Sequence, residues 1–116
     1  MRRYENLKAF TLADELALTV YKHTREYPQD ERFGLTAQIR RAAVSVPSNI
    51  VEGAAKDTEK DFLRFLHNAN GSLHELNYQL SLGHRLGYSS EEEYAAVNGL
   101  ANEGIKVLGG LIRSLR

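Results

Sequence analysis

Histidine and carboxylate side chains could bind a metal ion, but their spacing in this chain does not favour such a site. His67 and His74 are seven residues apart, which puts them on one helix face about 10 Å from each other, too far to share one ion. His74-Glu75 begins like the His-Glu-x-x-His zinc motif, but Tyr78 stands where the second histidine is required. The Glu-x-x-His pair of di-iron helical bundles does not occur. We therefore expect no metal, no other cofactor, and histidines that are exposed or hydrogen-bonded.

Motifs for covalent catalysis or nucleotide chemistry are also absent from the sequence. The chain contains no cysteine, which excludes disulfides and thiolate chemistry. It has no Gly-x-Ser-x-Gly nucleophile elbow, no phosphate-binding glycine loop and no Gly-x-Gly-x-x-Gly. The sequence therefore predicts a protein that is not an enzyme, with a metal-dependent enzyme as a remote alternative.

Short clusters of arginine offer a different chemistry, the binding of phosphate groups. The candidates for nucleic-acid contact are Arg2, Arg3, Arg40, Arg41 and Arg64. We expect the first two in a loose N-terminal tail and the other three on helices. Because 15 basic residues balance 15 acidic ones, no overall field attracts nucleic acid or anionic lipid. Ordinary solvated helix faces are the alternative interpretation.

Two lines of polar side chains recur with helical spacing. Steps of four and three residues place each line along one face of a helix. The lines consist of Ser45, Asn49 and Glu52, and of Asn68, Ser72 and Glu75. If the two lines face each other, they form a hydrogen-bonded seam that fixes the register of the helices. We predict this seam at Ser45, Asn49, Glu52, Ser72 and Glu75, with solvent exposure of both lines as the alternative.

The elements that would position these residues are helices, because apolar residues recur in steps of three and four along almost the whole chain. The pattern predicts four helices at residues 7–27, 33–55, 59–86 and 91–115. Short connections between amphipathic helices are typical of an up-down-up-down four-helix bundle. We therefore predict an all-α fold with one domain over residues 1–116.

Turn and cap residues mark the ends of these helices. Pro28 should end the first helix, because the residue before a proline avoids the α region. Pro47 falls inside the second helix and predicts a kink, with a complete break as the competing reading. The start of the third helix should be capped by Thr58, and Gly87 should end it. Ser90 before three glutamates predicts the start of the fourth helix.

Length and composition limit the class of protein and its expected location. A chain of 116 residues with 42% apolar and 26% charged residues is typical of one ordinary globular domain. No apolar run approaches the ~20 residues that span a bilayer, and the N-terminal residues lack the apolar stretch of a signal peptide. We expect a cytoplasmic protein that does not act at a membrane.

The expected fourth helix has more apolar surface than a bundle core requires. One side carries Gly104, Ile105, Leu108 and Ile112, while Leu100, Val107 and Leu111 lie on another. A helix in a monomeric bundle needs an apolar stripe only about 100° wide, and soluble monomers seldom leave larger patches exposed. We therefore predict a homo-oligomer with its interface at Gly104, Ile105, Leu108 and Ile112.

Three segments together carry a resemblance to a known family. The core of the first, residues 40–53, reads Arg-Arg-Ala-Ala-x-Ser-x-Pro-x-Asn-Ile-x-Glu-Gly, and the second, residues 71–76, reads Gly-Ser-Leu-x-Glu-Leu. With Phe-Leu-Arg-Phe-Leu at residues 62–66, the chain resembles the bacterial four-helix bundle family of intervening-sequence-encoded proteins of large-subunit ribosomal RNA. That family is sometimes labelled a ribosomal protein and includes the accessory proteins of diversity-generating retroelements.

The resemblance implies an all-α bundle that assembles as a ring-like homopentamer and has no known enzymatic activity. Retroelement members of the family bind RNA and a reverse transcriptase. We accordingly expect a non-catalytic oligomeric interaction protein, associated with RNA or the ribosome as the resemblance implies. The alternative is a nucleic-acid-binding adaptor that partners a reverse transcriptase. The expected partners are other copies of the chain, RNA, or another protein.

Overall fold

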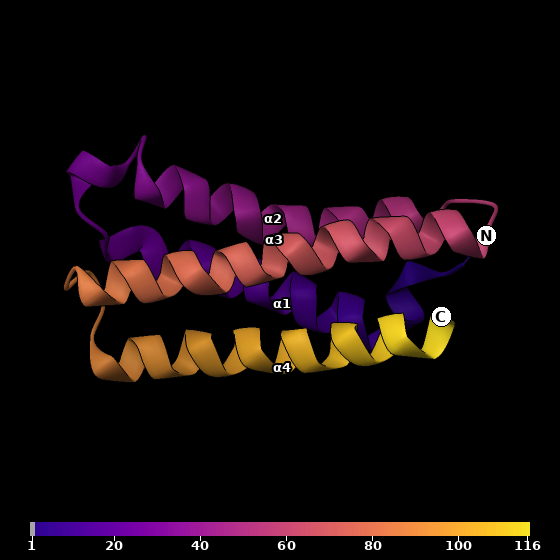
Figure 1. The fold of residues 1–116 in the computed structure, drawn as a ribbon. Coiled ribbons are helices and arrows are strands. Elements are labelled where there is room, and N and C mark those ends of the chain that lie inside the picture. Colours follow the sequence, from indigo (N-terminus) through magenta and orange to yellow (C-terminus); the bar gives the residue numbers. More distant parts are fainter. Residues whose placement is uncertain (1) are drawn as a thin grey trace.

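Four long helices dominate the structure, a computed structural model that describes residues 2–116. They are α1 (Lys8–His23), α2 (Leu35–Ala54), α3 (Glu59–Arg85) and α4 (Glu91–Leu115). Three short 3-10 turns, η1 (Tyr4–Asn6), η2 (Thr24–Glu26) and η3 (Gln29–Glu31), precede or connect them. Successive helices run in opposite directions and both chain ends lie at the same end of the bundle (Figure 1). The chain is an all-α, up-down-up-down four-helix bundle with one domain.

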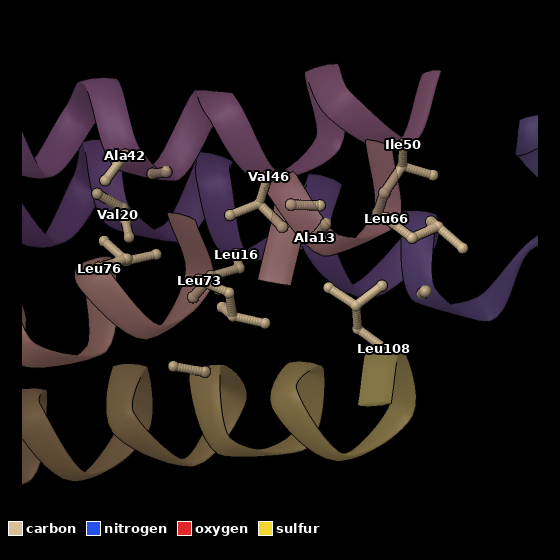
Figure 2. Packing of buried hydrophobic residues seen from close by; sticks show 14 of the residues in the cluster. Ala13, Leu16, Val20, Ala42, Val46, Ile50, Leu66, Leu73, Leu76 and Leu108 are labelled. Atoms are coloured by element: carbon tan, nitrogen blue, oxygen red, sulfur yellow. The ribbon is translucent and has the colours of Figure 1, made fainter. Parts of the chain in front are cut away.

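The core forms where the apolar stripes of the four helices meet. Each helix packs on its neighbours in sequence, and α4 closes the bundle against α1. Leu16, Val46, Leu73 and Leu108, one from each helix, are at most 2% exposed. Figure 2 shows these side chains pointing into the common interior. Burial of such side chains, each worth about 1.5–3 kcal/mol, is the main force that assembles the helices.

Helix ends follow the cap residues that the sequence indicated. The Thr58 hydroxyl accepts a hydrogen bond from the Asp61 backbone N–H at 3.1 Å. Ser90 and Glu93 form a reciprocal capping box at the start of α4. Gly87 has a φ of +85° after the end of α3, a conformation that glycine adopts at little cost. These three predictions are confirmed.

The first helix ends earlier than Pro28 would require. α1 stops at His23, and the chain continues through η2 before Tyr27 adopts an extended conformation ahead of the proline. The Thr24 hydroxyl donates to the Val20 carbonyl oxygen at 2.9 Å, at the point where the α-helix gives way to the 3-10 turn. A side-chain bond of this kind competes with the backbone ladder, so the helix is shorter than its apolar pattern.

The second helix passes through its proline without interruption. α2 is continuous from Leu35 to Ala54 with Pro47 inside it, so a complete break, the competing reading, is wrong. Val46 and Ile50, on either side of the proline, are both buried in the core. Tertiary packing therefore holds the helix together across the backbone hydrogen bond that proline removes.

Candidate functional site

The two polar lines meet between α2 and α3. The hydroxyl oxygens of Ser45 and Ser72 are 2.9 Å apart, a hydrogen bond across the helix interface. The Asn49 side-chain amide donates to the Ser45 carbonyl oxygen at 2.8 Å and to its hydroxyl oxygen at 3.1 Å. These three residues thus form a hydrogen-bonded cluster that ties one turn of α2 to α3.

A small groove of about 140 Å³ continues from this cluster. Glu75 and Gln79 of α3 line it together with Gln38 and Arg41 of α2. Gln79 is only 5% exposed, and its amide donates to a Glu75 carboxylate oxygen at 3.4 Å. Its own amide oxygen is buried without a partner among the described residues. A groove with these polar groups is suited to ordered water.

Sequence reasoning missed Gln79 although a signal was present. Gln79 continues the steps of the line through Ser72 and Glu75, one turn further along α3. The expectation also extended too far in the other direction. Glu52, which belonged to the predicted seam, is exposed and takes no part in the hydrogen-bonded cluster, and neither does Asn68 of the α3 polar line. The seam is therefore centred one turn closer to the α1–α2 end of the bundle than the sequence indicated.

The five candidate arginines do not form a single patch. Arg40 lies against the end of α1, where its Nε donates to the Thr24 hydroxyl at 2.8 Å. Arg41 is exposed beside the groove. Arg64 lies near the start of α3, 3.6 Å from the Asp61 carboxylate. Since α1 ends where α3 also ends (Figure 1), Arg40 and Arg64 lie in opposite halves of the bundle.

The N-terminal arginines are held more firmly than expected. The Arg2 backbone N–H donates to the Ala54 carbonyl oxygen, and its guanidinium to the Lys56 carbonyl oxygen, both at 3.1 Å. The guanidinium also lies 4.2 Å from the centre of the Phe62 ring. A loose tail is therefore wrong for Arg2, which is fixed to the α2–α3 connection. Arg3 is exposed and lies 3.9 Å from the Glu5 carboxylate.

The expected oligomer interface on α4 requires correction. Gly104, Leu108 and Ile112 face the interior, with Leu108 2% and Ile112 4% exposed. A β-carbon at Gly104 would be 3.5 Å from a Leu73 methyl group, so α4 is in ordinary contact with α3 there. Only Ile105 of the four is partly exposed. The apolar stripe that looked like an extra surface is the one that faces the core.

Exposed apolar side chains gather elsewhere, on the outer face of α1 and α2. Leu18 is 61%, Tyr21 43% and Val44 42% exposed. The Arg40 guanidinium is stacked 4.7 Å from the Tyr21 ring centre, which places these turns of α1 and α2 side by side. Because the two helices are antiparallel, Val44, one turn beyond Arg40, lies next to the turn that carries Leu18. We call Leu18, Tyr21 and Val44 the α1–α2 apolar patch.

One histidine, His84, packs and forms hydrogen bonds near the α3–α4 turn. The His84 ring is stacked on Tyr94 with ring centroids 4.4 Å apart, and its Nε2 lies 2.8 Å from the Glu91 carboxylate.

Within residues 2–116, no three histidine or carboxylate side chains are grouped so that they could hold a metal ion. Over the same residues, no helix is long and apolar enough to cross a membrane.

Comparison with known proteins identifies a family and solved structures with a similar fold. The family model described as 23S rRNA-intervening sequence protein matches residues 5–110. A crystal structure from Bacteroides thetaiotaomicron VPI-5482, of a protein with unknown function from the S23 ribosomal protein family, is similar with a TM-score of 0.83. The two chains are 25% identical, and the similarity covers 90% of this chain and 95% of the other. No curated protein matches.

Proposed function

Since the chain belongs to the 23S rRNA-intervening sequence protein family, we propose that it acts in the cytoplasm as a non-catalytic, oligomeric interaction protein. The proposed partner is another copy of the chain, and the family resemblance favours a five-fold ring. In a closed ring every copy of a shared interface is covered.

The α1–α2 apolar patch is the observation that carries this proposal. Three large side chains, each more than 40% exposed, lie on neighbouring turns of two helices. Single exposed apolar residues are common on protein surfaces, but adjacent ones mark sites of interaction. Phe33, 87% exposed in the connection before α2, adds a further apolar side chain at the same end of the bundle as Tyr21. Covering these groups would remove unfavourable apolar surface from water.

The mass of the protein in solution tests the proposal. Sedimentation velocity at micromolar concentration should give a multiple of the 13.1 kDa chain mass. Leu18→Glu and Val44→Glu place charges on the patch and should reduce the mass to that of one chain. Leu86→Glu is the matched control, because Leu86 is 52% exposed but lies at the end of α3. A measured mass of 13.1 kDa for the wild-type protein, that of a single chain, would reject the proposal.

Association with RNA is the second candidate. Arg41 of α2 is exposed and makes no ion pair with any of residues 2–116, and the same holds for Arg25 and Arg32 in the connection between α1 and α2. Unpaired guanidinium groups are available to phosphates. In an oligomer each of these arginines would be repeated, so a weak cluster on one chain would become a larger positive surface.

A further inference from the structure

A pocket of about 320 Å³ lies at the end of the bundle where α1 leads into α2. This volume is at the lower end of the range of small-molecule sites, which is about 300–1,000 Å³. Three of the residues that line it are arginines, namely Arg25, Arg32 and Arg40, and no aspartate or glutamate lines it. A concave site with three cations and no carboxylate is suited to an anion.

None of the three arginines that line the pocket has a carboxylate partner. Arg3 and Arg64 each lie within 4.0 Å of an acidic side chain, whereas Arg25, Arg32 and Arg40 form no ion pair with any described residue. Like charges around one small pocket repel one another, so the arrangement is unfavourable until an anion enters. A bound anion would offset this repulsion.

Arg40 is already held in position. Its Nε donates to the Thr24 hydroxyl at 2.8 Å and one Nη donates to the Tyr21 carbonyl oxygen at 3.3 Å. Its guanidinium also stacks on the Tyr21 ring, 4.7 Å from the ring centre. The other Nη has no partner among the described residues. Because the side chain is fixed before a ligand arrives, little conformational entropy is lost on binding.

The first turn of α2 adds a second feature that suits an anion. Thr36 lines the pocket and is only 7% exposed. Its buried hydroxyl oxygen has no hydrogen-bond partner within residues 2–116. A helical threonine has two accessible χ1 rotamers, so the buried hydroxyl could turn toward a ligand. The N-terminus of a helix also favours negative charge. The Glu31 carboxylate, close by in sequence, is engaged by the Leu35 N–H and the Tyr88 hydroxyl.

We propose that this pocket binds the phosphate group of a phosphate monoester through Arg25, Arg32 and Arg40. Guanidinium groups donate two parallel hydrogen bonds to phosphate oxygens, which gives both strength and orientation. The pocket is formed within one chain, so the inference rests on neither oligomer formation nor RNA association. The phosphate could belong to a free metabolite or to the 5′ end of a nucleic acid.

Calorimetric titration with inorganic phosphate and adenosine 5′-monophosphate tests the proposal at constant ionic strength. We expect dissociation constants below about 1 mM for the monophosphate. The double variant Arg25→Gln/Arg32→Gln should weaken binding at least about tenfold, since it removes two charged donors. The side chains of these two arginines are exposed and make no hydrogen bond to any of residues 2–116, so the variant should remain folded. Arg113→Gln, which changes an exposed arginine in the last turn of α4, away from the pocket, is the matched control.

An RNA oligonucleotide with and without a 5′ phosphate separates the two sources. Tighter binding of the phosphorylated form than of adenosine 5′-monophosphate, lost in the double variant, would assign the pocket to a nucleic-acid end. Equal affinity would assign it to a small phosphate ester. The proposal is overturned if neither phosphate nor the monophosphate binds, or if Arg113→Gln weakens binding as much as the double variant does.

Discussion

At the scale of single residues, His23 combines burial with an unmet hydrogen bond. Its Nε2 is buried without a partner among the described residues, and its ring packs edge-on against Tyr27 with centroids 5.7 Å apart. Burial lowers the pKa of His23 below the ordinary value of 6.5. The Glu93 carboxylate opposes this shift, while His84 adds to it. The folded state therefore holds His23 in its neutral form more strongly than the unfolded chain does.

The stability of the protein should consequently fall on mild acidification. Below pH 6.5 the unfolded chain binds a proton at His23 more readily than the folded one, so the free energy of unfolding decreases as pH falls. Urea unfolding between pH 7 and 5 should show a steeper loss for the wild type than for His23→Gln. The control is His67→Gln, a change at an exposed histidine, which should keep the wild-type slope. Equal slopes for wild type and His23→Gln would contradict this prediction.

Two glutamates contribute to stability in a lower range of pH. The pKa values of Glu31 and Glu93 are lowered from 4.5 mainly by backbone hydrogen bonds from Leu35 and Ser90, so their contribution to the free energy of unfolding is lost only at lower pH.

At the scale of the elements, glycines in one helix have opposite surroundings. Gly83 of α3 is buried against Tyr27, and a β-carbon there would overlap the tyrosine hydroxyl group. Gly71, three turns earlier in α3, is exposed and has no atom within 4 Å of the position of a β-carbon. The first glycine permits the chain before α2 to approach α3, whereas the second serves no close approach by any of residues 2–116.

Alanine at these two positions should therefore have opposite effects. Gly83→Ala should lower the free energy of unfolding by about 1–3 kcal/mol, because Tyr27 must move out of a packed site. Gly71→Ala should raise it by about 0.5–1 kcal/mol through better helix propensity. Urea denaturation of both variants measures the difference. A similar effect of both substitutions would show that propensity, and not packing, decides the cost at Gly83.

At the scale of the whole molecule, the charges balance but are not evenly placed. The 15 basic and 15 acidic residues give no net charge. Even so, three arginines surround the pocket at the α1–α2 end, and Arg2 and Arg64 lie toward the other end. Binding of RNA to this surface would therefore depend on local clusters and not on the overall field.

Such binding should depend strongly on salt. If RNA associates through Arg41 and its neighbours, the logarithm of affinity should fall linearly with the logarithm of salt concentration. Arg41→Gln should reduce that slope by about 1 per chain, since one phosphate contact is lost. Arg113→Gln, an exposed arginine in the last turn of α4, is the control. No mobility shift of a structured RNA at low salt would reject this candidate function.

Local features of this protein could be predicted from sequence because their causes are local. The apolar period indicated four helices, and Thr58, Gly87 and Ser90 marked where they start or end. A cap acts through hydrogen bonds to residues three positions away, so neighbouring residues suffice to identify it. The spacing of Ser45 and Ser72 within their polar lines also indicated residues that the structure brings within hydrogen-bond distance.

Features that depend on the packing of distant segments were decided only by the tertiary structure. The pattern of α4 contained two apolar faces, and only the positions of α1 and α3 determined that Gly104, Leu108 and Ile112 face inward. Arg40 looked like a free surface charge until the end of α1 supplied acceptors for it, 16 and 19 residues away in sequence. The periodicity of a helix specifies which residues share a face. The direction of that face depends on where the other helices lie, because burial is a property of the assembled bundle.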